Sequence, residues 1–96
     1  MDEISRDNAY SLASAIAEKI VSGEISEYAG GMRIWKDVID KLGSRCPDEL
    51  WPFKSNSSAI EDIKWNAEQG GDRNEKLIRQ CEHEIMAAAK QLTKQA

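Results

Sequence analysis

Apolar residues recur every three or four positions along much of the chain, which is the spacing of one face of an α-helix. The first stripe precedes Gly23 and comprises Ala9, Leu12, Ala13, Ile16, Ala17 and Ile20. Asp7 is the predicted N-cap, and Gly23 follows the last turn, where a residue without Cβ most easily adopts left-handed backbone. Residues 1–6 precede the pattern and are expected to fray. The spacing therefore predicts a first amphipathic helix between Asp7 and Gly23.

A second stripe begins after Ser26, a predicted N-cap, and stops before Gly43. It comprises Tyr28, Trp35, Val38, Ile39 and Leu42, with Met32 and Ile34 at its margins. Gly30 and Gly31 lie inside this predicted helix, where each glycine costs about 1 kcal/mol relative to alanine. Two interpretations account for the pair. Either the missing side chains admit a closely packed neighbouring helix, or a ligand or partner backbone contacts the helix there.

A short proline-bounded segment follows, and it contains the only phenylalanine of the chain. Pro47 suits the first position of a helical turn because it has no amide hydrogen to leave unpaired. Pro52 disfavours helical geometry at Trp51 and is expected to end that turn. Aromatic side chains bury about 150–250 Å² each. Leu50, Trp51 and Phe53 are therefore expected to close one end of the core together.

The pattern then predicts a polar loop over residues 54–57 and a third helix over 59–69. Ser58 and Glu61 have the spacing of a capping box, and Gly70 with Gly71 would end the helix. Its stripe is short and comprises Ile60, Ile63 and Ala67.

The last helix is predicted from a cap at Asp72 to about Thr93. Its stripe comprises Leu77, Ile78, Cys81, Ile85, Ala88, Ala89 and Leu92. No alternating run of β-branched residues predicts a strand. We therefore expect residues 1–96 to form one all-α domain, a small compact bundle of three to four helices with a short helical turn before the Leu-Trp-Pro-Phe segment.

The motifs Tyr28-x-Gly30, Ile34-Trp35 and Leu50-Trp51-Pro52-Phe53 follow one another in this order. The arrangement resembles a Y-x-G, I/L-W, L-W-P-F pattern in small uncharacterised bacterial proteins. The resemblance covers most of the chain after residue 12 and is most specific in its last motif. It implies an all-helical fold and carries no known activity.

The charge balance bears on the kind of partner. The chain has 17 acidic and 13 basic residues and a net charge of −4. Binding to a phosphate backbone needs a basic face, so the composition does not favour nucleic acid. Residues 1–25 hold five acids and two bases, a net charge of −3. A basic protein is therefore the partner that this charge would attract.

The start of the chain and its cysteines indicate the compartment. Met1-Asp2-Glu3 lacks the basic and apolar regions of a signal peptide, and no apolar run approaches the length of a membrane span. Cys46 and Cys81 do not form a disulfide framework. These features favour a cytoplasmic protein with two reduced thiols and no membrane contact.

No catalytic, metal-binding or cofactor-binding set stands out. His83-Glu84 begins like a zinc-protease motif, but the second histidine is replaced by Ala87. Cys81 and His83 are two residues apart, about 200° around a helix, so their side chains do not converge. We therefore assign no catalytic residue, metal ligand or cofactor.

Trp65 is the first candidate for a contact surface. It lies off the apolar stripe of the third predicted helix, beside Lys64 and Glu68. Exposed tryptophans are enriched at interface hot spots. The favoured function is a non-catalytic protein-interaction or regulatory module with an unknown, basic partner.

Two alternatives stay open at this point. One is a small enzyme or ligand-binding protein with a pocket beside Tyr28, Gly30, Gly31 and Trp51. The other is a homodimeric structural protein in which the Trp65 face is the self-interface. An exposed apolar patch favours an interaction module, and a concave pocket with a perturbed titratable group favours an enzyme.

Overall fold

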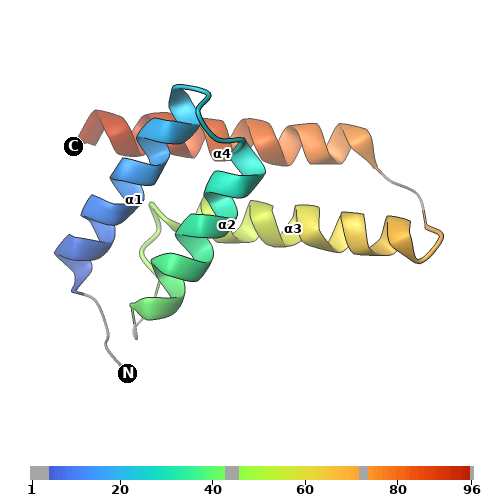
Figure 1. The fold of residues 1–96 in the computed structure, drawn as a ribbon, viewed down its shortest axis with the longest axis horizontal. Coiled ribbons are helices and arrows are strands. Elements are labelled where there is room, and N and C mark those ends of the chain that lie inside the picture. Colours follow the sequence, from blue (N-terminus) through green and yellow to red (C-terminus); the bar gives the residue numbers. More distant parts are fainter. Residues whose placement is uncertain (1–4, 43–45, 72–73, 96) are drawn as a thin grey trace.

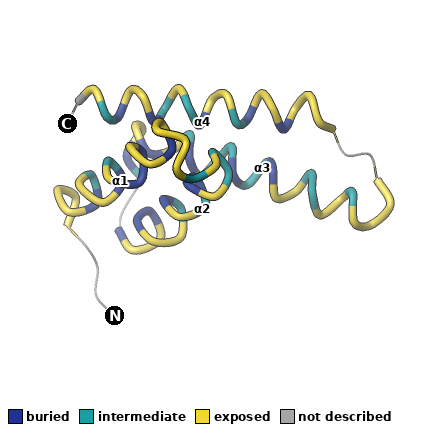
Figure 2. Tube along the Cα trace, turned by 45° about the horizontal axis from the view of Figure 1, so that its top comes forward, coloured by how far each residue is buried: buried dark blue, intermediate teal, exposed yellow. Residues whose placement is uncertain are grey.

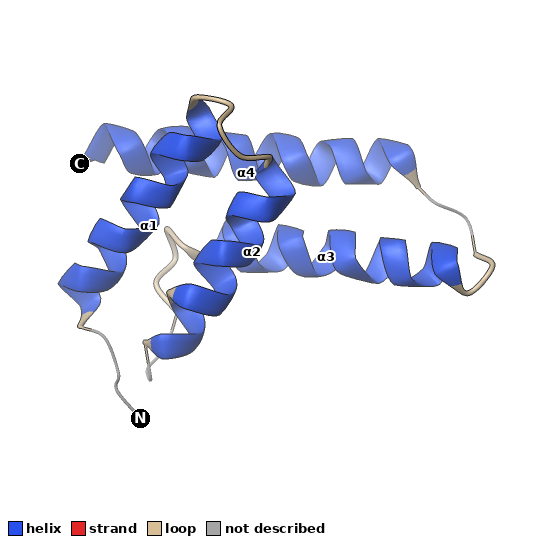
Figure 3. Ribbon diagram, in the orientation of Figure 1, coloured by secondary structure: helices blue, strands red, loops and turns tan. Residues whose placement is uncertain are grey.

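A computed structural model describes residues 5–42, 46–71 and 74–95 of the chain. In these ranges it contains four α-helices and one short 3-10 helix, and no strand (Figure 3). In chain order they are α1 (Arg6–Val21), α2 (Glu27–Asp37), η1 (Ile39–Lys41), α3 (Trp51–Glu68) and α4 (Glu75–Gln95). The predicted all-α bundle is confirmed.

The two longest helices form the frame of the molecule. α3 and α4 run side by side in opposite directions, and α1 packs on α4 while α2 crosses α3 (Figure 1). The far ends of α3 and α4 extend beyond the two shorter helices, which makes the molecule elongated, with extents of 42 × 30 × 21 Å. The shorter helices α1 and α2 therefore cover only one end of the α3–α4 pair (Figure 1).

All four helices contribute buried side chains to the core (Figure 2). Its fully enclosed large members are Phe53, Ile20, Ile34, Leu50, Ile60, Ile85 and Val38. The predicted α1 and α4 stripes supply most of the remaining core. One member of each stripe is not part of the core. Leu12 of α1 is 47% exposed, and Leu77 of α4 is 39% exposed.

Three of the predicted helix boundaries are confirmed. The Ser26 hydroxyl caps α2 and accepts a hydrogen bond of 3.1 Å from the Ala29 amide. Gly23 follows α1 with φ of 81°, and Gly70 follows α3 with φ of 93°. Both glycines have the left-handed backbone that a residue without Cβ adopts at low cost.

The N-caps of α1 and α4 are Ser5 and Asn74. Ser5, not Asp7, caps α1, since its Oγ accepts from the Asn8 amide at 3.1 Å. Asp72, the predicted cap of the last helix, lies outside the described residues. Asn74 Oδ1 accepts from the Leu77 amide at 3.0 Å and so caps α4. Ser, Asp and Asn are almost equivalent caps, so local sequence does not select among neighbours.

The second predicted helix is shorter than its stripe. α2 ends at Asp37, and residues 39–41 continue as the 3-10 helix η1. Gly43, the predicted stop, lies outside the described residues. The inner face of α2 consists of Gly30, Gly31 and Ile34, whereas Trp35 is only half-buried. The prediction therefore placed Trp35 on the buried face of α2, where Ile34 and the two glycines lie instead.

The start of α3 corrects the largest error in the sequence prediction. The short turn after Pro47 is present, with the Leu50 amide donating to the Pro47 carbonyl at 3.0 Å. Pro52 lies in the first turn of α3, where a residue without an amide hydrogen is tolerated. It therefore begins a helix and does not end one. The predicted loop over 54–57 is helical, and the predicted cap at Ser58 lies within the helix.

The expected closure of the core by three adjacent apolar residues is also corrected. Leu50 and Phe53 are fully buried, but Trp51 is 50% exposed. A helix turns about 100° per residue, so residues 50 and 53 share a face and residue 51 points away from it. The helical start of α3 therefore separates Trp51 from its neighbours.

Candidate functional site

The two adjacent glycines of α2 mark its closest contacts with other helices. A Cβ on Gly30 would collide with the Ile20 side chain of α1. A Cβ on Gly31 would collide with Ser57 Oγ of α3 and lie 3.3 Å from Ile85 Cδ1 of α4. Because both positions are buried against side chains, the missing Cβ atoms serve helix packing here. No room for a ligand is evident between Gly31 and Ser57.

The other two members of the predicted glycine site are aromatic residues that each lie beside a lysine of α3. Tyr28 is half-buried, and its ring lies under Lys64 Nζ, which is 4.3 Å from the ring centroid. Trp51 lies on the outer side of α3, with Lys54 Nζ 5.8 Å from its ring centroid. Each aromatic ring therefore contacts a lysine of α3, and a common site formed by all four residues stays a prediction.

The more exposed of the two tryptophans of α3, Trp65, lies among acidic residues. Trp65 is 60% exposed, the largest value among the exposed large apolar residues. Glu61, Asp62 and Glu68 are also exposed and stand four and three residues before it and three residues after it. Residues at these spacings are neighbours on a helix surface. We call Glu61, Asp62, Trp65 and Glu68 the Trp65 patch.

Lys64 does not belong to this patch, although it is adjacent in sequence. It is half-buried, and its ammonium group lies over Tyr28 of α2. Burial raises the pKa of Tyr28, and the nearby Glu61 carboxylate raises that pKa further. Of the predicted surface, Trp65 and Glu68 are exposed, while Lys64 joins α3 to α2. Glu61 and Asp62 were not predicted as part of this surface, although their helical spacing from Trp65 indicates that they are its neighbours.

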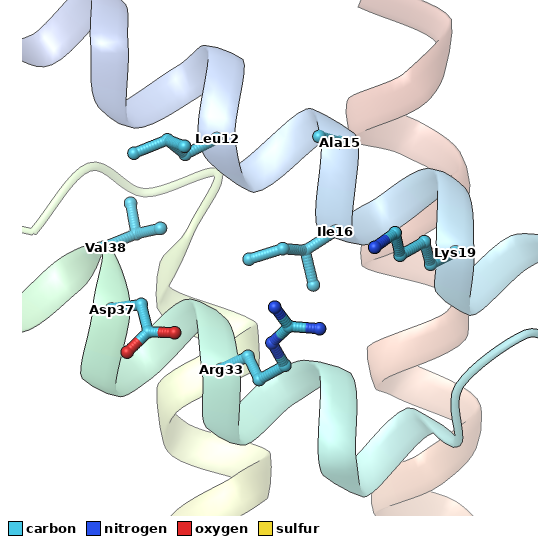
Figure 4. A pocket seen from close by; sticks show the side chains of 7 residues that line it. All are labelled: Leu12, Ala15, Ile16, Lys19, Arg33, Asp37 and Val38. Atoms are coloured by element: carbon cyan, nitrogen blue, oxygen red, sulfur yellow. The ribbon is translucent and has the colours of Figure 1, made fainter.

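A small cavity lies between α1 and α2 (Figure 4). Its volume is about 220 Å³, and its lining residues are Leu12, Ala15, Ile16, Lys19, Arg33, Asp37 and Val38. The prediction that placed Leu12 in the core did not anticipate this cavity. No local sequence signal identifies it, since it forms where two helices separate.

The two thiols and the histidine lie in different environments. Burial raises the pKa of both Cys46 and Cys81, which keeps each thiol protonated at neutral pH. Cys81 is buried in the core, whereas His83 is exposed on the outside of α4. In the described ranges no three residues among His, Cys, Asp and Glu are arranged to hold a metal ion. Those ranges also contain no helix whose length and apolar character would let it span a membrane.

Comparison of the chain with protein-family models, with curated proteins and with solved structures finds no match. The arguments for its function therefore come from its own residues and their arrangement.

Proposed function

We propose that this chain is a non-catalytic protein-interaction or regulatory module that binds a basic protein segment through the Trp65 patch. The observation that supports this function is an indole that is 60% exposed on a helix and flanked by exposed carboxylates. A bacterial cytoplasmic setting is part of the proposal.

The exposed indole supports a contact surface on energetic grounds. Leaving a large aromatic side chain in water forgoes a transfer gain of several kcal/mol, at about 25 cal/mol per Å². An interaction partner recovers that gain when it covers the ring. Tryptophan is also among the residues most enriched at interface hot spots. Because α3 is anchored by Phe53 and Ile60, the ring is presented from a rigid element.

The charges of α3 indicate a basic partner. All three exposed charged residues of α3 are acidic, namely Glu61, Asp62 and Glu68. Its two lysines, Lys54 and Lys64, are half-buried and lie over aromatic rings. An arginine or lysine from the partner would stack on the free indole face and pair with the carboxylates around it. Such charge complementarity also raises the association rate.

The two alternative functions have less support. A ligand site beside Gly30 and Gly31 would need space that Ile20 and Ser57 occupy. Self-association through Trp65 would place acidic patches of two copies against each other, which costs free energy. That alternative is an outcome of the experiment below.

The test is a quantitative capture experiment with the native host's lysate. Wild-type protein is compared with Trp65→Ala and with the charge-neutral triple variant Glu61→Gln, Asp62→Asn and Glu68→Gln. We expect one stoichiometric basic protein on the wild type, strongly reduced on both variants and weakened by added salt.

Two controls separate the patch from general surface effects. Glu84→Gln removes an exposed acid on α4, and Trp51→Ala removes an exposed indole from the start of α3. Both are expected to retain the partner. An acidic captured protein, or capture that survives Trp65→Ala, would contradict the proposal. Recovery of the chain itself as the only captured protein would support the homodimer.

A further inference from the structure

The cavity between α1 and α2 has an apolar floor that the fold leaves uncovered. Ile16 and Val38 are buried beneath it, and Leu12 forms part of its wall. Leu12 belongs to the inward stripe of α1, yet 47% of it is exposed. Arg33, Asp37 and Val38 line the opposite wall and leave Leu12 partly exposed. The floor therefore suits an apolar ligand body.

Two cations converge on one end of this cavity, one from each helix. The Lys19 ammonium and the Arg33 guanidinium both point toward Ile16, whereas Asp37 lies beside Val38 at the other end (Figure 4). The lining residues carry two positive charges and one negative charge, which gives a net charge of +1. This sign is opposite to the net charge of −4 of the whole chain. The local excess of positive charge selects an anionic group.

The size of the cavity limits its ligand. A volume of about 220 Å³ is below the range of about 300–1,000 Å³ that accommodates drug-sized molecules. A ligand of about ten non-hydrogen atoms fits, with part of its surface exposed to solvent. Asp37 would repel a second anionic group at the far end of the ligand.

We propose that this cavity binds a small amphipathic monocarboxylate, with its carboxylate between Lys19 and Arg33 and its apolar body over Leu12, Ile16 and Val38. The guanidinium supplies paired N–H donors that match a carboxylate, and the ammonium adds a second charge. This site lies on the α1–α2 side of the molecule and does not depend on the Trp65 patch.

The test uses octanoate as the probe, with binding followed by NMR chemical shifts of the uniformly labelled protein. We expect saturable shifts centred on the amides of Leu12, Ile16 and Arg33, with a dissociation constant in the millimolar range, as ligand efficiency predicts for so small a molecule. Octanol, which has the same apolar chain without the charge, and octanedioate, which has a carboxylate at each end, should each bind more weakly.

Matched variants distinguish the carboxylate contact from nonspecific binding. Arg33→Gln and Lys19→Gln should each weaken octanoate binding about three- to tenfold, because each removes one charge-assisted contact. Arg33→Lys should retain part of the affinity, and Arg79→Gln on α4 should have no effect. All three positions, Lys19, Arg33 and Arg79, are exposed, so the four variants are expected to fold.

Three results would overturn the proposal. Equal affinity for octanol and octanoate would show that the cations do not select the ligand. Unchanged binding in Arg33→Gln and Lys19→Gln would remove the proposed carboxylate site. Shifts centred on residues outside the cavity, or no shifts at all, would show that the cavity does not bind this class of molecule.

Discussion

The two sides of α3 differ in what surrounds them. On its inner side Phe53, Ser57 and Ile60 are almost completely buried against α2 and α4. On its outer side Trp51 and Trp65 are 50% and 60% exposed. The comparison shows that aromatic residues only two positions apart serve opposite purposes, one in the core and one at the surface. The residue type does not decide which of the two side chains is buried. Their positions around the helix axis decide it.

The largest expected effect separates the two sides directly. Phe53→Ala should reduce the free energy of unfolding by about 3–5 kcal/mol, because it leaves a cavity in the core. Trp51→Ala should change the free energy by less than about 1 kcal/mol, because half of that side chain is already in water. Chemical denaturation of both variants measures the difference. Equal losses would show that the outer side is covered as fully as the inner side.

The next effect concerns the contact of the inner side with α2. Gly31→Ala would place a Cβ against Ser57 Oγ, and overpacking typically costs about 1–3 kcal/mol. The helix propensity of alanine offsets about 1 kcal/mol of that cost. In a Ser57→Ala background the obstructing oxygen is absent, so Gly31→Ala should become neutral or stabilising.

A double-mutant cycle in denaturant measures this coupling, which we expect to be about 1–2 kcal/mol. The two single variants, the double variant and the wild type are compared under identical conditions. Additive effects would show that Ser57 does not set the distance between α2 and α3.

A smaller effect is expected from Ser57→Ala alone. Ser57 is fully buried, and its Oγ has no hydrogen-bond partner among the described residues. An unpaired buried hydroxyl costs free energy, so its removal should stabilise the protein by about 1 kcal/mol. Ser58→Ala, at the adjacent half-buried position, is the matched control and should have little effect. A destabilised Ser57→Ala variant would indicate that the hydroxyl is paired in solution.

The smallest effect is expected on the outer side. Trp65→Ala should change the free energy of unfolding by less than about 0.5 kcal/mol in a dilute monomer. Thermal melts at several protein concentrations measure this. A loss that grows with concentration would show that Trp65 is covered by a second copy, which favours the homodimer over a separate partner.

The helix boundaries show where local sequence was sufficient. Ser26, Gly23 and Gly70 were predicted correctly because capping and left-handed backbone depend on one residue and its neighbours. Ser5 and Asn74 were missed because each stands close to an equally good cap. Which of two neighbouring residues caps the helix depends on where tertiary packing fixes the first helical turn.

The candidate surfaces show where local sequence was not sufficient. Exposure of Trp65 followed from helical phase alone and is confirmed. The displacement of Lys64 onto Tyr28 and the cavity beside Leu12 could not be predicted, since each requires the placement of α2 against another helix. Pro52 was predicted to end a helix but lies in the first turn of α3, because proline is compatible with both a helix end and a helix start.

The periodicity of apolar residues by itself determined the helical class and the exposure of Trp65, because both depend on the repeat of one helix. Only the tertiary structure decided which residues meet across helices. The glycine contacts of α2, the burial of Phe53 without Trp51, and the convergence of Lys19 and Arg33 all depend on how helices distant in sequence are placed. That placement is set by the summed packing of many side chains, which no local pattern records.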